Sequence, residues 1–134
     1  MGTLYVARSA KLSGWASEVG LSKHVFKVGY TDEPLREAVK SGWAGGDDWV
    51  IVRKLKADGL DEDAIVARLQ RKEKMIDPAY YPRLKGATGI FKVVPEHVEN
   101  HIIVAKSLEG GELPKITKLK PIDFADYLIH NATR

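Results

Sequence analysis

Tyr5, Lys27 and Arg36 are three side chains that the fold could bring to one surface. Tyr5 lies in the run TLYVARS (3–9), and Lys27 lies in the run HVFKVGY (24–30). Successive side chains of a strand point to opposite faces, so pairing of the apolar faces would leave Tyr5 and Lys27 together on the other face. Arg36 follows near the start of a predicted helix, where the helix dipole disfavours a cation unless an anion shares the site. Because a guanidinium stays charged and binds oxyanions well, these residues indicate a site for an anionic group.

A small set of predicted elements has to position these side chains. Alternating apolar patterns predict strands at 3–9, 24–30, 49–56 and 90–94. The run WVIVRKLK, at 49–56, has apolar residues on both faces and is predicted to be a central strand. Helices are predicted over about 33–41, 62–76, 96–108 and 122–131, and the segment 10–23 is predicted to be a connection with one helical turn. This order predicts an α+β fold, a small and mostly antiparallel sheet flanked by helices.

Length and composition limit the classes of protein to which the chain can belong. The 134 residues favour one domain over 1–134, with 109–134 as a C-terminal extension packed on it. The sequence has no cysteine, which excludes disulfides and thiolate metal sites. Without a long apolar run, no membrane partner is expected. The opening MGTLYVARS lacks the features of a signal peptide, so we expect a cytoplasmic protein.

Basic residues are concentrated between residues 53 and 92, and the net charge is +3. Arg68, Arg71 and Lys72 are candidate contacts to a nucleic-acid backbone. Tyr80 and Tyr81, between basic residues, could stack on bases. The alternative interpretation is a solvated basic helix face, with the two tyrosines covering the core.

The ordered pair of strand motifs resembles the GIY-YIG endonuclease superfamily. TLY (3–5) stands where the family has its first half-motif, and KVG (27–29) where it has the second. The run GYTDEPLR (29–36) resembles the family's glycine, threonine and arginine run. The branch with a lysine in place of the second tyrosine is the closer match, and GIFKVVPEHV (89–98) resembles its closing aromatic strand. The resemblance covers about residues 3–104 and implies a GIY-YIG-like fold whose first two strands are antiparallel neighbours.

The resemblance also implies an activity, the hydrolysis of nucleic-acid phosphodiesters with one divalent metal ion. By position, Tyr5 would orient or deprotonate the attacking water, Lys27 would share the catalytic face, and Arg36 would neutralise the scissile phosphate. A glutamate on the second helix would hold Mg²⁺. We expect nucleic acid as the partner, DNA in preference to RNA. The alternative is a catalytically inactive GIY-YIG-like module that binds nucleic acid or another protein.

Two glutamates of the predicted helix at 62–76 are candidates for the metal ligand. The family's glutamate lies in the middle of this helix, where the present sequence has Arg68 instead. Helical spacing groups six residues into one largely apolar stripe, with the two glutamates at its edge. The stripe consists of Glu62, Ile65, Val66, Leu69, Glu73 and Ile76. Glu73 is the preferred ligand and Glu62 the second choice. The other interpretation is that each glutamate pairs with a neighbouring basic residue at a solvated surface.

Overall fold

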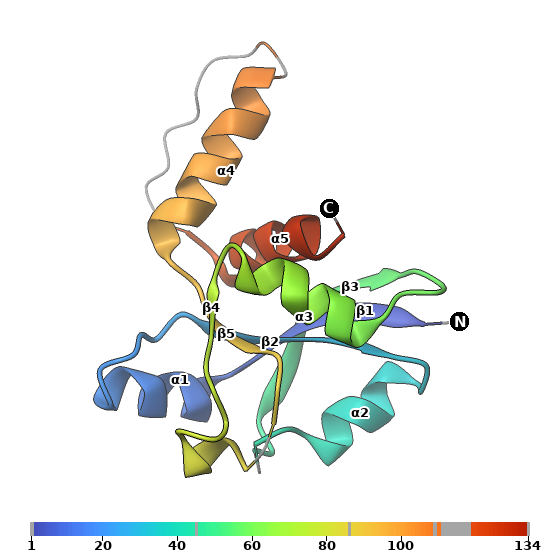
Figure 1. Ribbon diagram of the computed structural model, residues 1–134, viewed down its shortest axis with the longest axis vertical. Helices are drawn as coiled ribbons and strands as arrows, with labels where there is room; N and C mark the ends of the chain where they lie inside the picture. Colours follow the sequence, from blue (N-terminus) through green and yellow to red (C-terminus); the bar gives the residue numbers. More distant parts are fainter. Residues whose placement is uncertain (1, 45, 86, 109, 111–118, 134) are drawn as a thin grey trace.

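A computed structural model describes residues 2–44, 46–85, 87–108, 110 and 119–133. Within these residues a single sheet is flanked by helices (Figure 1). Its five strands are β1 (Thr3–Ser9), β2 (Val25–Thr31), β3 (Trp49–Lys56), β4 (Lys74–Met75) and β5 (Ile90–Lys92). The helices are α1 (Ala10–Glu18), α2 (Leu35–Ser41), α3 (Glu62–Gln70), the short 3-10 helix η1 (Pro82–Leu84), α4 (Pro95–Leu108) and α5 (Pro121–Ala132).

The strand order is β3-β1-β2-β5-β4, and every pair of neighbours is antiparallel. The predicted α+β fold is therefore confirmed, and so is the antiparallel pairing of the first two strands. The prediction that β3 is a central strand was wrong, because β3 lies at the edge of the sheet. Its first residue, Trp49, is buried, but Val50 is 61% exposed and the residues from Arg53 to Lys56 face solvent. A basic, exposed half-strand of this kind suits an edge.

Strand alternation gives the sheet two different faces. On one face Leu4, Val6, Phe26 and Val28 form a core with α3 and α5. On the other face Tyr5 packs in a second core beneath α1 and the turn that precedes β3. Figure 1 shows the corresponding layers, with α3, α4 and α5 on one side of the sheet and α1 and α2 on the other.

Two predicted segment assignments were wrong for identifiable physical reasons. Residues 10–18 form the helix α1 rather than a single turn, because the Ser9 hydroxyl caps it by accepting a hydrogen bond from the Leu12 amide at 3.2 Å. Helix α3 ends at Gln70 and not near 76. Beyond its end the chain turns, and Lys74–Met75 pairs with β5, so that these backbone groups bond in the sheet rather than in a helix.

The C-terminal helix α5 is part of the main core. Phe124 and Leu128 are buried together with Leu4 and Val6 of β1. The connection predicted at 109–121 lies mostly outside the described residues. None of the described helices combines the length and the apolarity needed to cross a bilayer.

Candidate functional site

Tyr5, Lys27 and Glu62 line one open pocket on the second face of the sheet. The first two come from the central strands β1 and β2, as the alternation predicts. Glu62 is the first residue of α3, and it reaches the pocket beside β2. Strand β5 pairs with β2 only from Val25 to Lys27, so the rest of that edge of β2 is left to other elements. The opposite wall is formed by the end of α2 and by Trp43.

Tyr5 is held firmly and is only 4% exposed. Its ring stacks on Trp43, with 5.2 Å between the ring centroids and 23° between the planes. Gly29 stands directly opposite in the ladder and leaves room for the phenol. Burial raises the pKa of Tyr5 above its ordinary value, and the charge of Glu62 raises it further. The phenol therefore stays protonated at neutral pH, where it can orient a water molecule but cannot act as a phenolate base.

Lys27 is equally buried, and its charge is only partly compensated. Its Nζ donates a hydrogen bond to the Thr88 carbonyl oxygen at 2.6 Å and lies 3.7 Å from Glu62 Oε1. The Trp43 ring centroid is 5.9 Å from the same nitrogen. Burial lowers the pKa of Lys27, and the nearby Glu62 carboxylate opposes that shift. A lysine with a lowered pKa in a pocket is a candidate proton acceptor.

Glu62 is the carboxylate that lies beside Lys27, and its side chain is 41% exposed. Asp32 and Glu33, which are exposed, also line the pocket. An exposed carboxylate oxygen is the kind of ligand that Mg²⁺ prefers, with waters completing the shell. Among the described residues, no group of three or more histidine or acidic side chains is arranged to hold a metal ion. Glu62 would therefore have to share a cation with water and with the substrate.

Glu73, the preferred metal ligand from the sequence, does not join this pocket. Its side chain is 1% exposed, and its oxygens bond to three partners in the α4–α5 layer. His97 Nδ1 lies 2.7 Å away, the Tyr127 hydroxyl donates at 3.1 Å, and the Val94 amide donates at 3.4 Å. Glu62 is the first residue of α3, whereas Glu73 lies beyond its last residue, so the length of the helix, about 13 Å, lies between them. Of the two candidates, the structure brings only Glu62 to Tyr5.

Arg36 also lies away from the pocket of Tyr5. Helix α2 turns Ala38 and Ser41 towards that pocket. Arg36 lines a different hollow, between α2 and the edge strand β3, together with Lys54. The structure therefore does not place Arg36 beside Tyr5, where the sequence led us to expect it. With seven residues, α2 is also too short to support the helix-dipole argument made for an anion at its start.

The predicted nucleic-acid contacts are dispersed. Arg68 bonds to the Ala132 carbonyl oxygen at 3.1 Å and so closes the end of α5. Arg71 and Lys72 are exposed at the end of α3 remote from Glu62. Tyr80 is 81% exposed, while Tyr81 packs edge-on against Trp15. Both tyrosines line a hollow beside β4 that is separate from the pocket of Tyr5.

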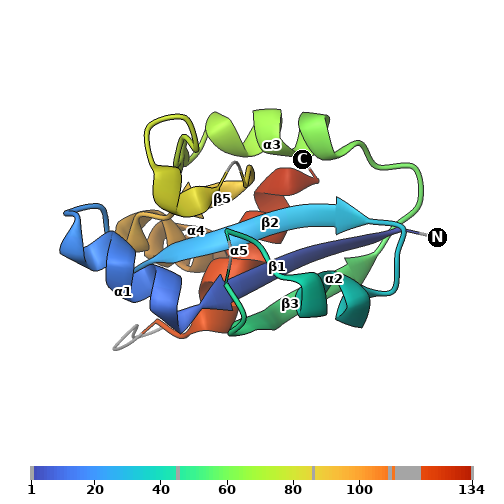
Figure 2. The same cartoon turned by 90° about the horizontal axis from the view of Figure 1, so that it is seen from below.

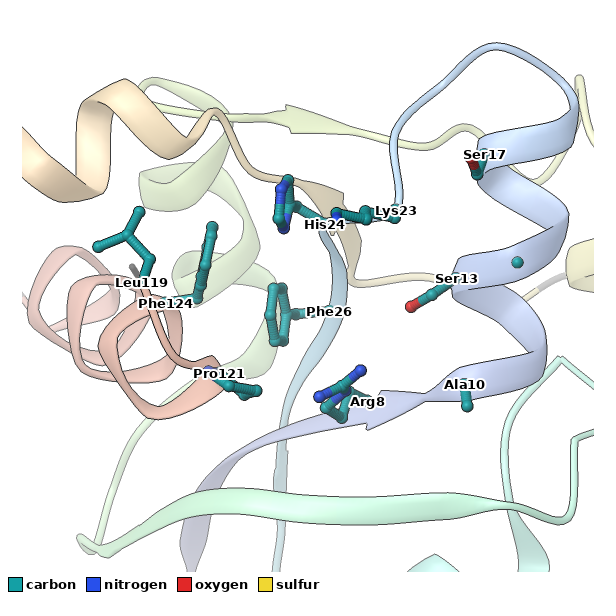
Figure 3. Close-up of a pocket in the computed structure, with 11 residues that line it drawn as sticks. Arg8, Ala10, Ser13, Ser17, Lys23, His24, Phe26, Leu119, Pro121 and Phe124 are labelled. Atoms are coloured by element: carbon teal, nitrogen blue, oxygen red, sulfur yellow. The ribbon is translucent and has the colours of Figure 1, made fainter. Parts of the chain in front are cut away.

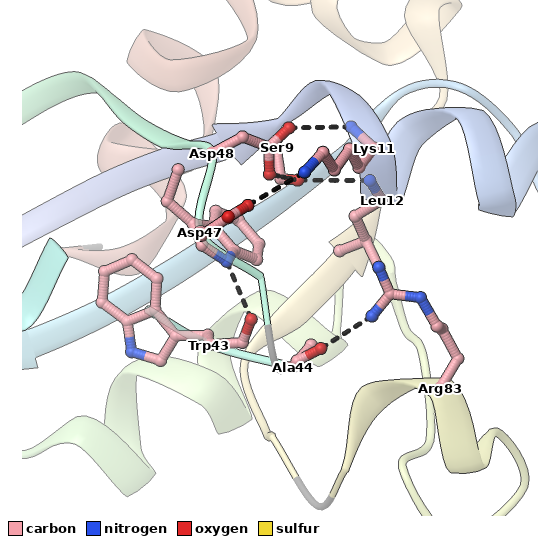
Figure 4. A network of polar contacts seen from close by, with 9 residues as sticks. Ser9, Lys11, Leu12, Trp43, Ala44, Asp47, Asp48 and Arg83 are labelled. Carbon is pink, nitrogen blue, oxygen red and sulfur yellow. Dashed lines mark hydrogen bonds and ion pairs between the residues drawn. The ribbon is translucent and has the colours of Figure 1, made fainter. Parts of the chain in front are cut away.

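A polar network that was not predicted from the sequence surrounds the turn that carries Trp43 (Figure 4). Trp43 in turn stacks on Tyr5. Asp48 accepts hydrogen bonds from the Ser9 hydroxyl and from the Lys11 amide, and this ties the glycine-rich turn to the start of α1. Arg83 of η1 donates to the Ala44 carbonyl oxygen at 2.7 Å. The Trp49 indole donates to the Trp43 carbonyl oxygen at 2.8 Å. The available sequence signal was a tryptophan between glycines and before two aspartates, in SGWAGGDD.

No protein-family model, curated protein or solved structure matches the chain. Any functional assignment therefore depends on the geometry of the pocket and on the chemistry of its side chains.

Proposed function

We propose that the protein hydrolyses nucleic-acid phosphodiesters in the pocket of Tyr5, Lys27 and Glu62, with one divalent cation held by Glu62. The observation that carries the proposal is the position of the Glu62 carboxylate. It is accessible, and it lies 3.7 Å from Lys27 Nζ in the pocket that also holds Tyr5. The antiparallel pairing of β1 with β2 and the half-motifs TLY and KVG support a GIY-YIG-type site.

Each of the three side chains has a distinct task in this proposal. A cation bound at Glu62 would supply charge stabilisation to the phosphoryl oxygens. Tyr5, kept neutral by burial, orients the attacking water by hydrogen bonding. Lys27, in its neutral form, would accept the proton of that water as the water oxygen attacks phosphorus, and would return it to the departing oxygen as the P–O bond breaks. A cation at Glu62 would neutralise the negative charge that opposes the lowered pKa of Lys27, and would lower that pKa further.

A second candidate function, a catalytically silent nucleic-acid-binding module, is favoured by the position of Arg36. A phosphodiesterase needs a fixed cation on the scissile phosphate, and the arginine expected there faces β3 instead. Arg36 and Lys54 share that hollow and could contact a nucleic-acid backbone without contributing to the chemistry.

A cleavage assay with matched variants tests the first function. Plasmid DNA and structured RNA are incubated with the protein in Mg²⁺ or Mn²⁺, with a chelator as the blank. We expect Glu62→Gln, Lys27→Met and Tyr5→Phe each to lower the rate at least about 100-fold. Asp63→Asn is the control, since it removes the same charge from the adjacent, exposed position of α3. Equal loss in Asp63→Asn and Glu62→Gln would contradict a specific role for Glu62.

Binding measurements separate the two functions. Salt-sensitive binding that is weakened by Arg36→Ala, with no cleavage by the parent protein, would establish the silent module. Cleavage that depends on Glu62 but not on Arg36 would establish the enzyme. Absence of both cleavage and salt-sensitive binding would reject both functions.

A further inference from the structure

A second pocket lies between α1 and α5, at the end of the sheet where β1 finishes and β2 begins (Figure 3). Its volume is about 570 Å³, which is in the usual range for small-molecule sites and more than an inorganic anion needs. It opens away from the pocket of Tyr5, because Arg8 and Phe26 alternate onto the opposite face of the same strands from Tyr5 and Lys27.

Positive charge converges on this pocket, and no carboxylate is among the described residues that line it. Arg8 occupies the last core-facing position of β1, after Leu4 and Val6, where the pattern would otherwise place an apolar residue. Lys23 lies next to His24 on the opposite wall (Figure 3). Among the described residues neither Arg8 nor Lys23 forms an ion pair, whereas Lys11, Lys27 and Arg53 each have a carboxylate partner.

The environment of His24 reports the same positive potential. Its pKa is lowered by burial first, and then by the charges of Lys23 and Arg8. Glu96 is the acidic group that acts in the opposite direction, and its effect is the smallest of the four. A cluster of cations with this little compensation favours an anionic ligand.

The remaining walls supply one hydroxyl and an apolar surface. Figure 3 shows the Ser13 hydroxyl of α1 pointing into the pocket. Three rings form a continuous stack, because Phe124 lies 4.8 Å from the His24 ring and 5.2 Å from the Phe26 ring, with interplanar angles of 15° and 21°. Leu119 and Pro121 extend this apolar side. A ligand that fills the pocket therefore needs both an anionic group and an apolar or ring-shaped part.

We propose that this pocket binds a small organic phosphate, such as a nucleoside monophosphate. Its phosphate lies against Arg8, with Lys23 and Ser13 as further partners, and its ring system lies along the aromatic wall. Phosphate suits the site better than a carboxylate, because two cations and a hydroxyl can serve its three terminal oxygens. This binding is independent of the hydrolytic site proposed above.

Isothermal titration calorimetry on the full chain tests the proposal. The probes are AMP, ribose 5-phosphate, adenosine and inorganic phosphate, and the variants are Arg8→Gln, Lys23→Gln and Ser13→Ala. Lys40→Gln, which removes an exposed cation from α2, is the matched control. We expect AMP to bind saturably, Arg8→Gln to weaken binding about tenfold or more, and Lys40→Gln to leave it unchanged. Thermal unfolding of each variant checks that the fold is retained.

Four results would overturn the proposal. The first is no saturable heat with AMP or ribose 5-phosphate at millimolar concentration. The second is equal affinity of AMP for the parent and for folded Arg8→Gln. The third is equal affinity for AMP and for adenosine or inorganic phosphate, because the ligand must use both the cations and the apolar wall. The fourth is at least tenfold tighter binding of a 5′-phosphorylated oligonucleotide than of AMP, which would assign the pocket to a strand end.

Discussion

Gly29 stands directly opposite Tyr5 in the β1–β2 ladder, and a Cβ atom at Gly29 would lie 2.4 Å from the Tyr5 hydroxyl oxygen. The same Cβ would lie 2.7 Å from the ring carbon that bears the hydroxyl. The glycine is therefore required by the position of the phenol across the strand. A tyrosine at this position of β1 therefore needs a glycine at the facing position of β2, because a larger residue would overlap the phenol ring.

Gly29→Ala is expected to displace the Tyr5 ring from its stack on Trp43. Overpacking of this kind costs typically about 1–3 kcal/mol of unfolding free energy. Chemical denaturation of the two proteins measures the loss. Gly14→Ala is the control, because its Cβ would meet no atom within 4 Å, and in the middle of α1 it should stabilise by about 0.5–1 kcal/mol. Unchanged stability of Gly29→Ala would show that the ring is not held as described.

Asp48→Ala should loosen the turn that carries Trp43. The change removes the acceptors of the Ser9 hydroxyl and of the Lys11 amide. We expect a loss of about 1 kcal/mol in unfolding free energy and a change in tryptophan fluorescence as the Trp43 ring leaves Tyr5. The neighbouring Asp47→Ala is the control. It breaks only the exposed pair with Lys11, whose side chains are 65% and 83% exposed, and such pairs contribute less than about 1 kcal/mol. Equal effects of the two substitutions would argue against the network.

The lowered pKa of Lys27 predicts a particular dependence of stability on pH. In the unfolded chain this lysine has its ordinary pKa of 10.5, whereas burial lowers the value in the folded protein. Between the two values the unfolded state binds more protons, so the contribution of Lys27 makes stability rise with pH. Lys27→Met should remove this rise. Identical curves of unfolding free energy against pH for the two proteins would contradict the lowered pKa.

Tyrosine ionisation limits the pH range in which the stabilities of the parent and of Lys27→Met can be compared. The pKa values of Tyr5 and Tyr127 are raised in the folded protein, chiefly by burial. Above about pH 10 the unfolded chain therefore loses tyrosine protons first, and stability falls as pH rises. The unfolding experiments with Lys27→Met belong below that pH, where the contribution of the lysine acts alone among these three groups.

The pairing and facing of the first two strands could be predicted from sequence because both depend on local patterns. Alternation over 3–9 and 24–30 is enough to place Tyr5 and Lys27 on one face, whatever the rest of the fold. The edge position of β3 could not be predicted in this way. Which strand becomes its neighbour is decided by contacts between distant segments, and the apolar start of β3 suited a central strand equally well.

The sequence could not show which of Glu62 and Glu73 lies beside Tyr5, because this depends on where a helix ends. A helix continued to 76 would keep both carboxylates on one stripe. The observed helix ends at Gln70, and Glu73 turns into the α4–α5 layer instead. The face of α2 on which Arg36 lies could not be predicted for a related reason. A helix of seven residues can present several faces, and the packing of α2 against β3 selects one of them.

Glu73 is predicted to act in stability and not in chemistry, and a double-mutant cycle with Tyr127 tests this. Its buried carboxylate accepts from the Tyr127 hydroxyl and pairs with His97, so it joins the end of α3 to both α4 and α5. Glu73→Gln should lower the unfolding free energy by about 1–3 kcal/mol, while Glu96→Gln, at an exposed position of α4, should change it by less than about 1 kcal/mol. Tyr127→Phe and the double variant complete the cycle, and coupling of about 0.5 kcal/mol or more is expected.

Titration of Tyr127 gives a second, independent measure of the same contact. Burial is the main reason why the pKa of Tyr127 is raised, and the charge of Glu73 adds to it. Removing that charge in Glu73→Gln should therefore lower the pKa of Tyr127, and alkaline titration of tyrosinate absorbance can follow the shift. The folded variant should still cleave nucleic acid if the parent does, since Glu62 and not Glu73 lies beside Tyr5. Loss of cleavage in Glu73→Gln, with stability and Tyr127 titration unchanged, would identify Glu73 as the metal ligand in place of Glu62.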